Sequence, residues 1–167
     1  MNRRKPVRSQ LRRPAARVEP PAQRNGRPET VPRVRVLVVE DHADTRDLVV
    51  TILKTEGYEV ELADDGDLAI RRYREQPADI VLMDLYLPRQ DGVTTIRQLH
   101  AEFPGVVVIA MSGDGGSIWR DALAEARAAG ALLTLRKPIE PWVLLRALEG
   151  LVAGRKTLAS AALHRTA

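Results

Sequence analysis

The chain has 167 residues, of which 44% are hydrophobic, so it can build the core of one ordinary domain. It contains no cysteine, which excludes a disulfide framework and a thiolate metal site and agrees with a reducing, cytoplasmic location. The net charge of +4 is unevenly spread: residues 1–33 carry ten basic and two acidic residues, whereas residues 34–152 carry 13 basic and 20 acidic residues. No apolar segment reaches the length of a membrane span, and the N-terminus lacks the apolar stretch of a secretory signal.

The basic character belongs mainly to residues 1–33, which also contain six of the 11 prolines and few large apolar side chains. Such a segment cannot offset the entropy that it would lose on ordering, so we predict a disordered arm. Its positive charges would give weak, salt-sensitive and non-specific affinity for nucleic acid. A solvated leader with no partner explains the same composition, and a salt titration with and without the arm distinguishes the two.

An alternation of apolar strands and amphipathic helices begins at Val34. The strand candidates are short, mostly apolar runs rich in β-branched residues, and glycine or proline ends several of the helical segments. On the first helix, Leu48, Ile52 and Leu53 share one side. In chain order the pattern predicts strand 34–39, helix 44–56, strand 58–63, helix 67–75, strand 79–83, helix 93–102, strand 106–111, helix 117–129, strand 131–135 and helix 141–152.

Five strand–helix repeats with nearly continuous apolar strands indicate a sheet that is buried on both faces, hence a parallel sheet with helices on each side. Right-handed crossovers leave few arrangements of such a sheet. We therefore predict an α/β fold, a three-layer doubly wound sandwich whose five parallel strands have the flavodoxin-like order 2-1-3-4-5. The folded domain would span residues 34–152, with residues 153–167 as a short C-terminal tail.

Charged and polar residues stand where four of these strands end. The first strand ends in Glu40 and Asp41, the third in Asp84, the fourth in Ser112 and the fifth in Lys137. In such a sheet ligands bind outside the carboxyl ends of the strands, so these side chains would meet at one edge. Three close carboxylates need a cation, and Mg²⁺ suits a few carboxylates while leaving room for a phosphoryl group. The lysine and serine would then bind phosphoryl oxygens, and Asp84 is the candidate nucleophile.

Each of these residues also has a purely structural interpretation. A single aspartate at a strand end is often a turn former or a helix cap, and a single lysine there is often a solvated charge. Their occurrence together at one predicted edge favours the functional interpretation. Asp64 and Asp65 follow the second strand, which should lie at the side of the sheet, so we do not expect them to join the group.

Four segments carry a resemblance to the receiver domain of bacterial two-component response regulators. They are VLVVEDH (36–42), DIVLMDLYLPRQDG (79–92), VIAMSG (108–113) and GALLTLRKPIE (130–140). The resemblance covers about residues 34–152, and as a set the motifs are specific for that family. Since only 15 residues follow residue 152, the chain is similar to the stand-alone, single-domain type without an output domain.

The resemblance implies that Asp84 accepts a phosphoryl group from a phosphohistidine of a sensor histidine kinase or phosphotransfer protein. It implies Mg²⁺ as the cofactor, held by Glu40, Asp41, Asp84 and the backbone carbonyl of Tyr86. It also implies that Ser112 and Lys137 hold the oxygens of the phosphoryl group.

The family likeness also predicts how the signal is read and ended. Ser112 and the residue at position 134 would form the switch, and Tyr86 and Asp114 lie where relatives tune the rate of dephosphorylation. The Lys137–Pro138 peptide bond is expected to be cis. Phosphorylation would bias a two-state equilibrium that unknown downstream proteins or a phosphorelay read out, with the chain as a monomer or a phosphorylation-dependent dimer. No enzyme activity is expected beyond self-phosphorylation from a phosphodonor and slow self-dephosphorylation.

Three features depart from the family pattern. Thr134 stands where relatives usually have the aromatic switch residue, so the usual aromatic movement cannot occur. The loop at residues 113–117 is longer and glycine-rich, which predicts a mobile lid beside the site. Trp142 and Val143 occupy positions that are usually polar, and they form either a partner surface or padding between helices.

An enzyme of a different class uses similar residues. Phosphohydrolases of the haloacid dehalogenase type combine a strand-end aspartate nucleophile with Mg²⁺ and a lysine. They need a second aspartate two residues after the nucleophile, and Tyr86 stands at that position here. The same missing aspartate argues against a Toprim nuclease fold.

Overall fold

The computed structural model describes the backbone of residues 33–113 and 118–163, and the side chains of residues 33–113 and 121–154. The predicted basic arm, apart from Arg33, and most of the glycine-rich loop lie outside these residues. The disorder of the arm, its nucleic-acid binding and the mobile lid therefore stay predictions.

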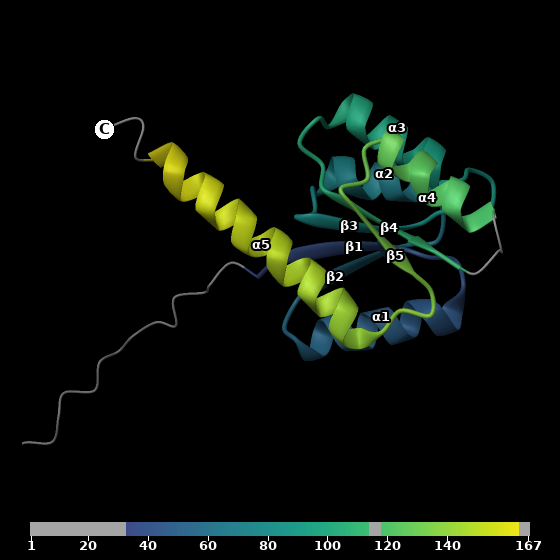
Figure 1. The fold of residues 1–167 in the computed structure, drawn as a ribbon, viewed down its shortest axis with the longest axis horizontal. Helices are drawn as coiled ribbons and strands as arrows, with labels where there is room; N and C mark the ends of the chain where they lie inside the picture. The colour runs from purple at the N-terminus through teal and green to yellow at the C-terminus, as the bar shows by residue number, and fades with distance from the viewer. Residues whose placement is uncertain (1–32, 114–117, 164–167) are drawn as a thin grey trace, which may run out of the picture. The chain divides into compact units, whose positions relative to one another are not determined.

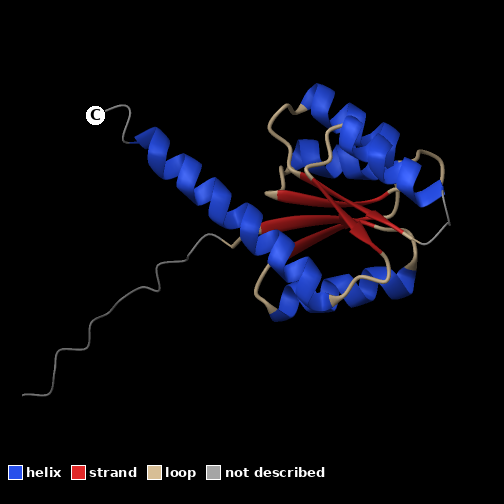
Figure 2. Ribbon diagram, viewed as in Figure 1, coloured by secondary structure: helices blue, strands red, loops and turns tan. Residues whose placement is uncertain are grey.

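Five parallel strands form one sheet in the order β2-β1-β3-β4-β5, as predicted. The strands are drawn in red in Figure 2, between the helices. Strands β1, β3 and β4 form the buried centre of the sheet, and β2 lies at one edge. The short, alternating sequence of β2 predicted this outer position. The strands are β1 (Arg35–Val39), β2 (Glu59–Ala63), β3 (Ile80–Asp84), β4 (Val108–Ser112) and β5 (Leu133–Arg136).

Two helical layers cover the sheet (Figure 1). Helices α1 and α5 lie on one face and α2, α3 and α4 on the other, and each layer closes its own cluster of buried apolar side chains. The predicted three-layer α/β fold is confirmed. The helices are α1 (Ala43–Thr55), α2 (Gly66–Glu75), α3 (Gly92–Glu102), α4 (Ile118–Ala128) and α5 (Pro141–Leu163).

Helix α1 turns a different side inward than predicted. Val49 and Leu53 are fully buried, Ile52 is partly buried against the same cluster, and Leu48 is 48% exposed. Residues four apart lie on one side of a helix, so the sequence allowed either Leu48 with Ile52 or Val49 with Leu53 to face the sheet. Packing against the apolar cluster between the sheet and helices α1 and α5 favours Val49 with Leu53.

The predicted end of the last helix at residue 152 is wrong, because α5 continues to Leu163. Leu144 and Leu148 are fully buried and anchor its first turns against β-strand side chains. A glycine inside a helix costs only about 1 kcal/mol relative to alanine, so Gly154 weakens the helix without ending it. The alanines, lysine and leucines that follow favour helix.

No helix within the described parts of the chain is both long enough and apolar enough to cross a membrane.

Candidate functional site

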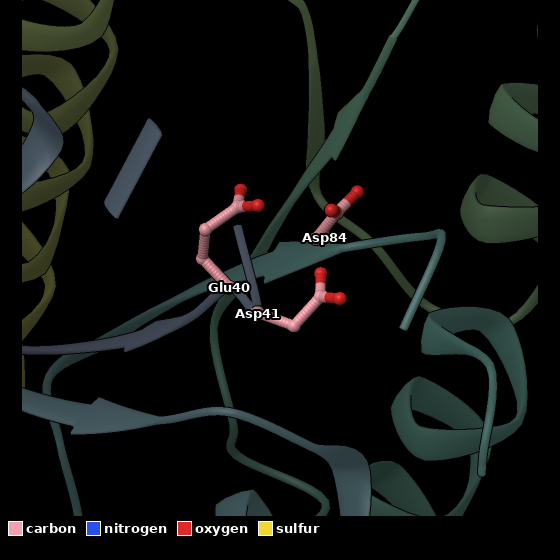
Figure 3. Close-up of side chains that lie close together, drawn as sticks. All are labelled: Glu40, Asp41 and Asp84. Atoms are coloured by element: carbon pink, nitrogen blue, oxygen red, sulfur yellow. The ribbon is translucent and has the colours of Figure 1, made fainter. Parts of the chain in front are cut away.

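Three carboxylates meet at the carboxyl edge of the sheet. Glu40 and Asp41 directly follow β1, and Asp84 is the last residue of β3, its neighbour in the sheet. One carboxylate oxygen from each lies within 4.8 Å of the others. Figure 3 shows the three side chains close together at this edge. Glu40 and Asp84 are buried, whereas Asp41 is exposed, so the group opens to solvent on one side.

Lys137 follows β5 and reaches across the edge of the sheet to two of these carboxylates. Its Nζ donates hydrogen bonds to Glu40 Oε2 at 2.5 Å and to Asp84 Oδ2 at 2.7 Å. Its backbone N–H donates to the carbonyl of Ser112 at 2.7 Å, which ties the loop to the end of β4. The Lys137–Pro138 bond is cis, as expected. One ammonium group therefore lies between two buried carboxylates.

The buried glutamate has an unusual proton affinity. Burial raises the pKa of the Glu40 carboxyl above its ordinary value, and the negative charge of Asp84 raises it further. The hydrogen bond and charge of Lys137 lower the pKa but offset this rise only in part. A divalent cation would supply the missing positive charge.

The other predicted site residues also lie along this edge. Ser112, the last residue of β4, is buried, and its neighbour Met111 is in register with Asp84. The backbone N–H of Tyr86 donates to Asp84 Oδ1 at 3.2 Å, and Tyr86 as a whole is half exposed. Whether the Tyr86 carbonyl binds a metal stays a prediction, and Asp114 lies outside the described residues.

The residues present fit a magnesium ion. Mg²⁺ prefers oxygen ligands and is commonly held by a few carboxylates together with water. Among the side chains that the structure describes, the three carboxylates at this edge form a cluster of that kind, and the exposed Asp41 leaves space for water.

Thr134, at the position of the usual aromatic switch residue, is bound to helix α4. Its hydroxyl accepts a hydrogen bond of 2.9 Å from Arg127 Nη2. A polar contact thus joins α4 to β5 at this position.

The two candidate partner residues on α5 differ. Trp142 is 63% exposed, which is compatible with a partner surface. Val143 is partly buried against the apolar cluster under α5, so for this residue the padding interpretation is the better one.

The sequence analysis missed one contact of the loop that follows Asp84. Asp65 is buried at the start of α2, and its carboxylate forms an ion pair with Arg89 in the loop between β3 and α3. The aspartate carries the ordinary signal of a helix cap before Gly66, and it does cap α2. No local pattern in the sequence marks Arg89 as its partner, because 24 residues separate the two.

Gly92 begins α3 in close contact with the backbone of the site. A Cβ atom there would lie 2.1 Å from the carbonyl oxygen of Asp84 and 2.8 Å from the Cα of Leu85. Both neighbours are main-chain atoms at the end of a buried strand and cannot move aside easily.

We therefore expect Gly92→Ala to lower the free energy of unfolding by about 2–3 kcal/mol, the cost of overpacking a rigid site. Urea denaturation measures the change. Gly150→Ala is the matched control, because its new methyl group meets no atom within 4 Å in the middle of α5. A Gly92→Ala variant as stable as the wild type would contradict the expected clash.

Comparison with known families decides what kind of domain this is. The family model of the response regulator receiver domain matches residues 36–149. The chain belongs to this family. The predicted family and fold are thus confirmed, and the chain contains the receiver domain of a two-component response regulator.

Curated relatives share this receiver domain but extend beyond it. A transcriptional regulatory protein, PdtaR from Mycobacterium tuberculosis, is 38% identical over 122 residues, which cover 71% of this chain and 56% of the relative. A protein-glutamate methylesterase/protein-glutamine glutaminase from Rhodopseudomonas palustris is 38% identical over 110 residues, 64% of this chain and 29% of the relative. The chain thus spans between about a third and about a half of these relatives.

Solved structures show the same fold. A CheY-like receiver domain protein from Methanospirillum hungatei matches with a TM-score of 0.68 at 28% identity, covering 75% of this chain and 98% of that protein. The receiver domain of NtrX from Brucella abortus matches with a TM-score of 0.66 at 30% identity, covering 71% of this chain and 98% of that domain.

Proposed function

We propose that this receiver domain takes up a phosphoryl group on Asp84 from a phosphohistidine of a sensor histidine kinase or phosphotransfer protein, with Mg²⁺ as cofactor. The observation that supports this most is the arrangement around Asp84: a buried carboxylate at a strand end, bonded to Lys137 and within 4.8 Å of two further carboxylates. A carboxylate placed only for stability would not need a second and a third negative charge beside it.

The residues that would hold the metal are Glu40, Asp41 and Asp84, with the backbone carbonyl of Tyr86. When bound, Mg²⁺ would neutralise part of the negative charge of the pocket and of the incoming phosphoryl group. The exposed carboxylate of Asp41 lies on the solvent side, from which a donor would approach.

The transfer forms a bond between a carboxylate oxygen of Asp84 and phosphorus, and it breaks the bond between phosphorus and the donor nitrogen. Both oxygens of Asp84 are hydrogen-bonded, Oδ1 to the N–H of Tyr86 and Oδ2 to Lys137. These donors orient the carboxylate before the attack. Lys137 would then pair with the oxygens of the transferred group, where its charge offsets the added negative charge.

The readout would begin at the neighbouring strand ends. Ser112 is buried next to the site, and its hydroxyl donates a long hydrogen bond of 3.4 Å to the carbonyl of Gly113, a weak contact that would let it turn to an acyl phosphate on Asp84. A shift there would pass to β5 and to α4 through the hydrogen bond between Thr134 and Arg127. Exposed Trp142 on α5 is our candidate contact for a downstream protein.

The test is the intact mass of the wild-type chain after incubation with Mg²⁺ and acetyl phosphate. One phosphate adduct per chain is expected, absent when EDTA is present, and borohydride reduction followed by peptide mapping should place it at Asp84. Absence of an adduct at every Mg²⁺ concentration, also with a phosphorylated histidine donor, would overturn the proposal. Rapid continuous release of phosphate without an adduct would favour a phosphohydrolase instead.

A further inference from the structure

The loop at residues 85–91 joins the phosphoacceptor strand β3 to α3 and contains Tyr86. Within this loop, Arg89 has a φ of 67°, and among the described residues it is the one non-glycine residue with a positive φ. For an L-residue this conformation costs about 1–2 kcal/mol. Something in the fold must therefore hold Arg89 in this conformation.

An ion pair with Asp65 holds Arg89 in this conformation. Arg89 Nη2 donates to Asp65 Oδ2, while Asp65 Oδ1 accepts the N–H of Leu68 at 2.7 Å and caps α2. The carboxylate of Asp65 is 7% exposed and fixed by the helix that it caps, whereas the side chain of Arg89 is 67% exposed. The arginine is thus the movable partner and the aspartate is the anchor.

The two ends of the loop are fixed in other ways. At the C-terminal end, Asp91 accepts the N–H of Thr94 at 2.9 Å as the cap of α3, and the N–H of Gly92 donates to the Leu85 carbonyl at 3.1 Å. At the N-terminal end, the N–H of Tyr86 donates to Asp84. The pair of Arg89 and Asp65 ties the middle of the loop to a different helix, α2.

We propose that Arg89 is a positioning residue for the metal site: its ion pair with Asp65 holds the loop so that the main chain at Tyr86 stays beside the acidic pocket. This inference rests on the proposed function, since it assigns the loop a part in binding Mg²⁺. An ion pair with so exposed a partner contributes little to global stability. Its effect should therefore appear in metal binding rather than in the free energy of unfolding.

The sign of the effect separates positioning from simple electrostatics. Arg89 carries a positive charge in the loop that follows Asp84, and Coulomb's law alone says that removing a positive charge should strengthen the binding of a cation or leave it unchanged. Loss of positioning should weaken that binding instead. For Arg89→Ala the two explanations thus predict opposite changes in the dissociation constant of Mg²⁺, whereas for Asp65→Asn, which removes a negative charge, both predict weaker binding.

Calorimetric titration of the unphosphorylated chain with Mg²⁺ provides the measurement. We expect Arg89→Ala to raise the Kd for Mg²⁺ about three- to tenfold. This loss of affinity is no larger than the smallest losses typical of residues that orient metal ligands. Asp65→Asn should have a similar effect, because an asparagine can still cap α2 but loses the charged partner of Arg89. Arg89→Lys should recover part of the affinity, because the charge is kept.

Arg97→Ala is the matched control, since it removes an exposed arginine from α3 without touching the loop. Its Kd should equal that of the wild type or fall slightly. Thermal unfolding without metal should show all variants folded. An unchanged or lower Kd for both Arg89→Ala and Asp65→Asn would overturn the inference.

The phosphorylation assay keeps the two proposals apart. If the wild type accepts a phosphoryl group, Arg89→Ala should need more Mg²⁺ to reach its half-maximal rate of phosphorylation. At saturating Mg²⁺ its rate should approach that of the wild type. If the wild type is phosphorylated and the Mg²⁺ dependence of Arg89→Ala is unchanged, the inference fails and the proposed function stands. If the wild type binds Mg²⁺ but never takes up phosphate, the proposed function fails, and the calorimetric comparison still decides the role of Arg89 in metal binding.

Discussion

Asp84→Asn is expected to take up no phosphate from acetyl phosphate while remaining folded. The amide keeps the shape of the side chain but is not a nucleophile, so the bond to phosphorus cannot form. Its stability should equal or exceed that of the wild type, because the charge that helps to raise the pKa of Glu40 is gone. Intact mass after incubation with Mg²⁺ measures the first effect and thermal unfolding measures the second.

Asp91→Asn is the matched control for this experiment. Asp91 is exposed and caps α3 only seven residues further along the chain, and asparagine caps helices about as well as aspartate. This variant should be phosphorylated like the wild type. A phosphate adduct on Asp84→Asn as abundant as that on the wild type would mean that another residue is the acceptor.

Lys137→Met should have two separate effects. Without metal, Glu40 and Asp84 would lose the ammonium group that lies between them, and leaving buried charges unpaired costs about 3–5 kcal/mol of folding stability. Added Mg²⁺ should restore part of this loss, because it would supply positive charge to the same oxygens. The rate of phosphorylation at saturating Mg²⁺ should fall about 100-fold or more, the usual cost of removing a group that stabilises developing charge.

Urea denaturation with and without Mg²⁺ measures the change in stability, and the initial rate of adduct formation measures the catalytic change. Lys54→Met serves as the control, because Lys54 is an exposed lysine in the last turn of α1. If Lys137→Met is as stable as the wild type without metal and gains no more from Mg²⁺, the lysine does not compensate the buried carboxylates.

The strands and the acidic edge could be predicted from the sequence because both depend on local patterns. Runs such as 80–83 are short and apolar at every position, as expected for a strand covered on both faces. Once the strands are known to be parallel, the position of Glu40, Asp84 and Lys137 at one edge follows without any side-chain detail.

Other features depend on contacts that no local pattern encodes. The choice of Val49 over Leu48 as the inward residue of α1 is made by the way the helix docks on the sheet. The ion pair between Asp65 and Arg89 joins two segments far apart in sequence, and nothing about an arginine after a proline marks a positive φ. The difference between exposed Trp142 and half-buried Val143 likewise follows from the rotation of α5 about its axis.

The position of Lys137 has a further consequence for metal binding. Its ammonium group is hydrogen-bonded to one oxygen of Glu40 and one of Asp84, so it acts as an internal counter-ion that a bound divalent ion would have to displace or share. The affinity for Mg²⁺ would then reflect an exchange between two cations rather than the filling of an open set of ligands. Such an exchange would let the metal leave while the pocket keeps its charge compensation and its folded structure.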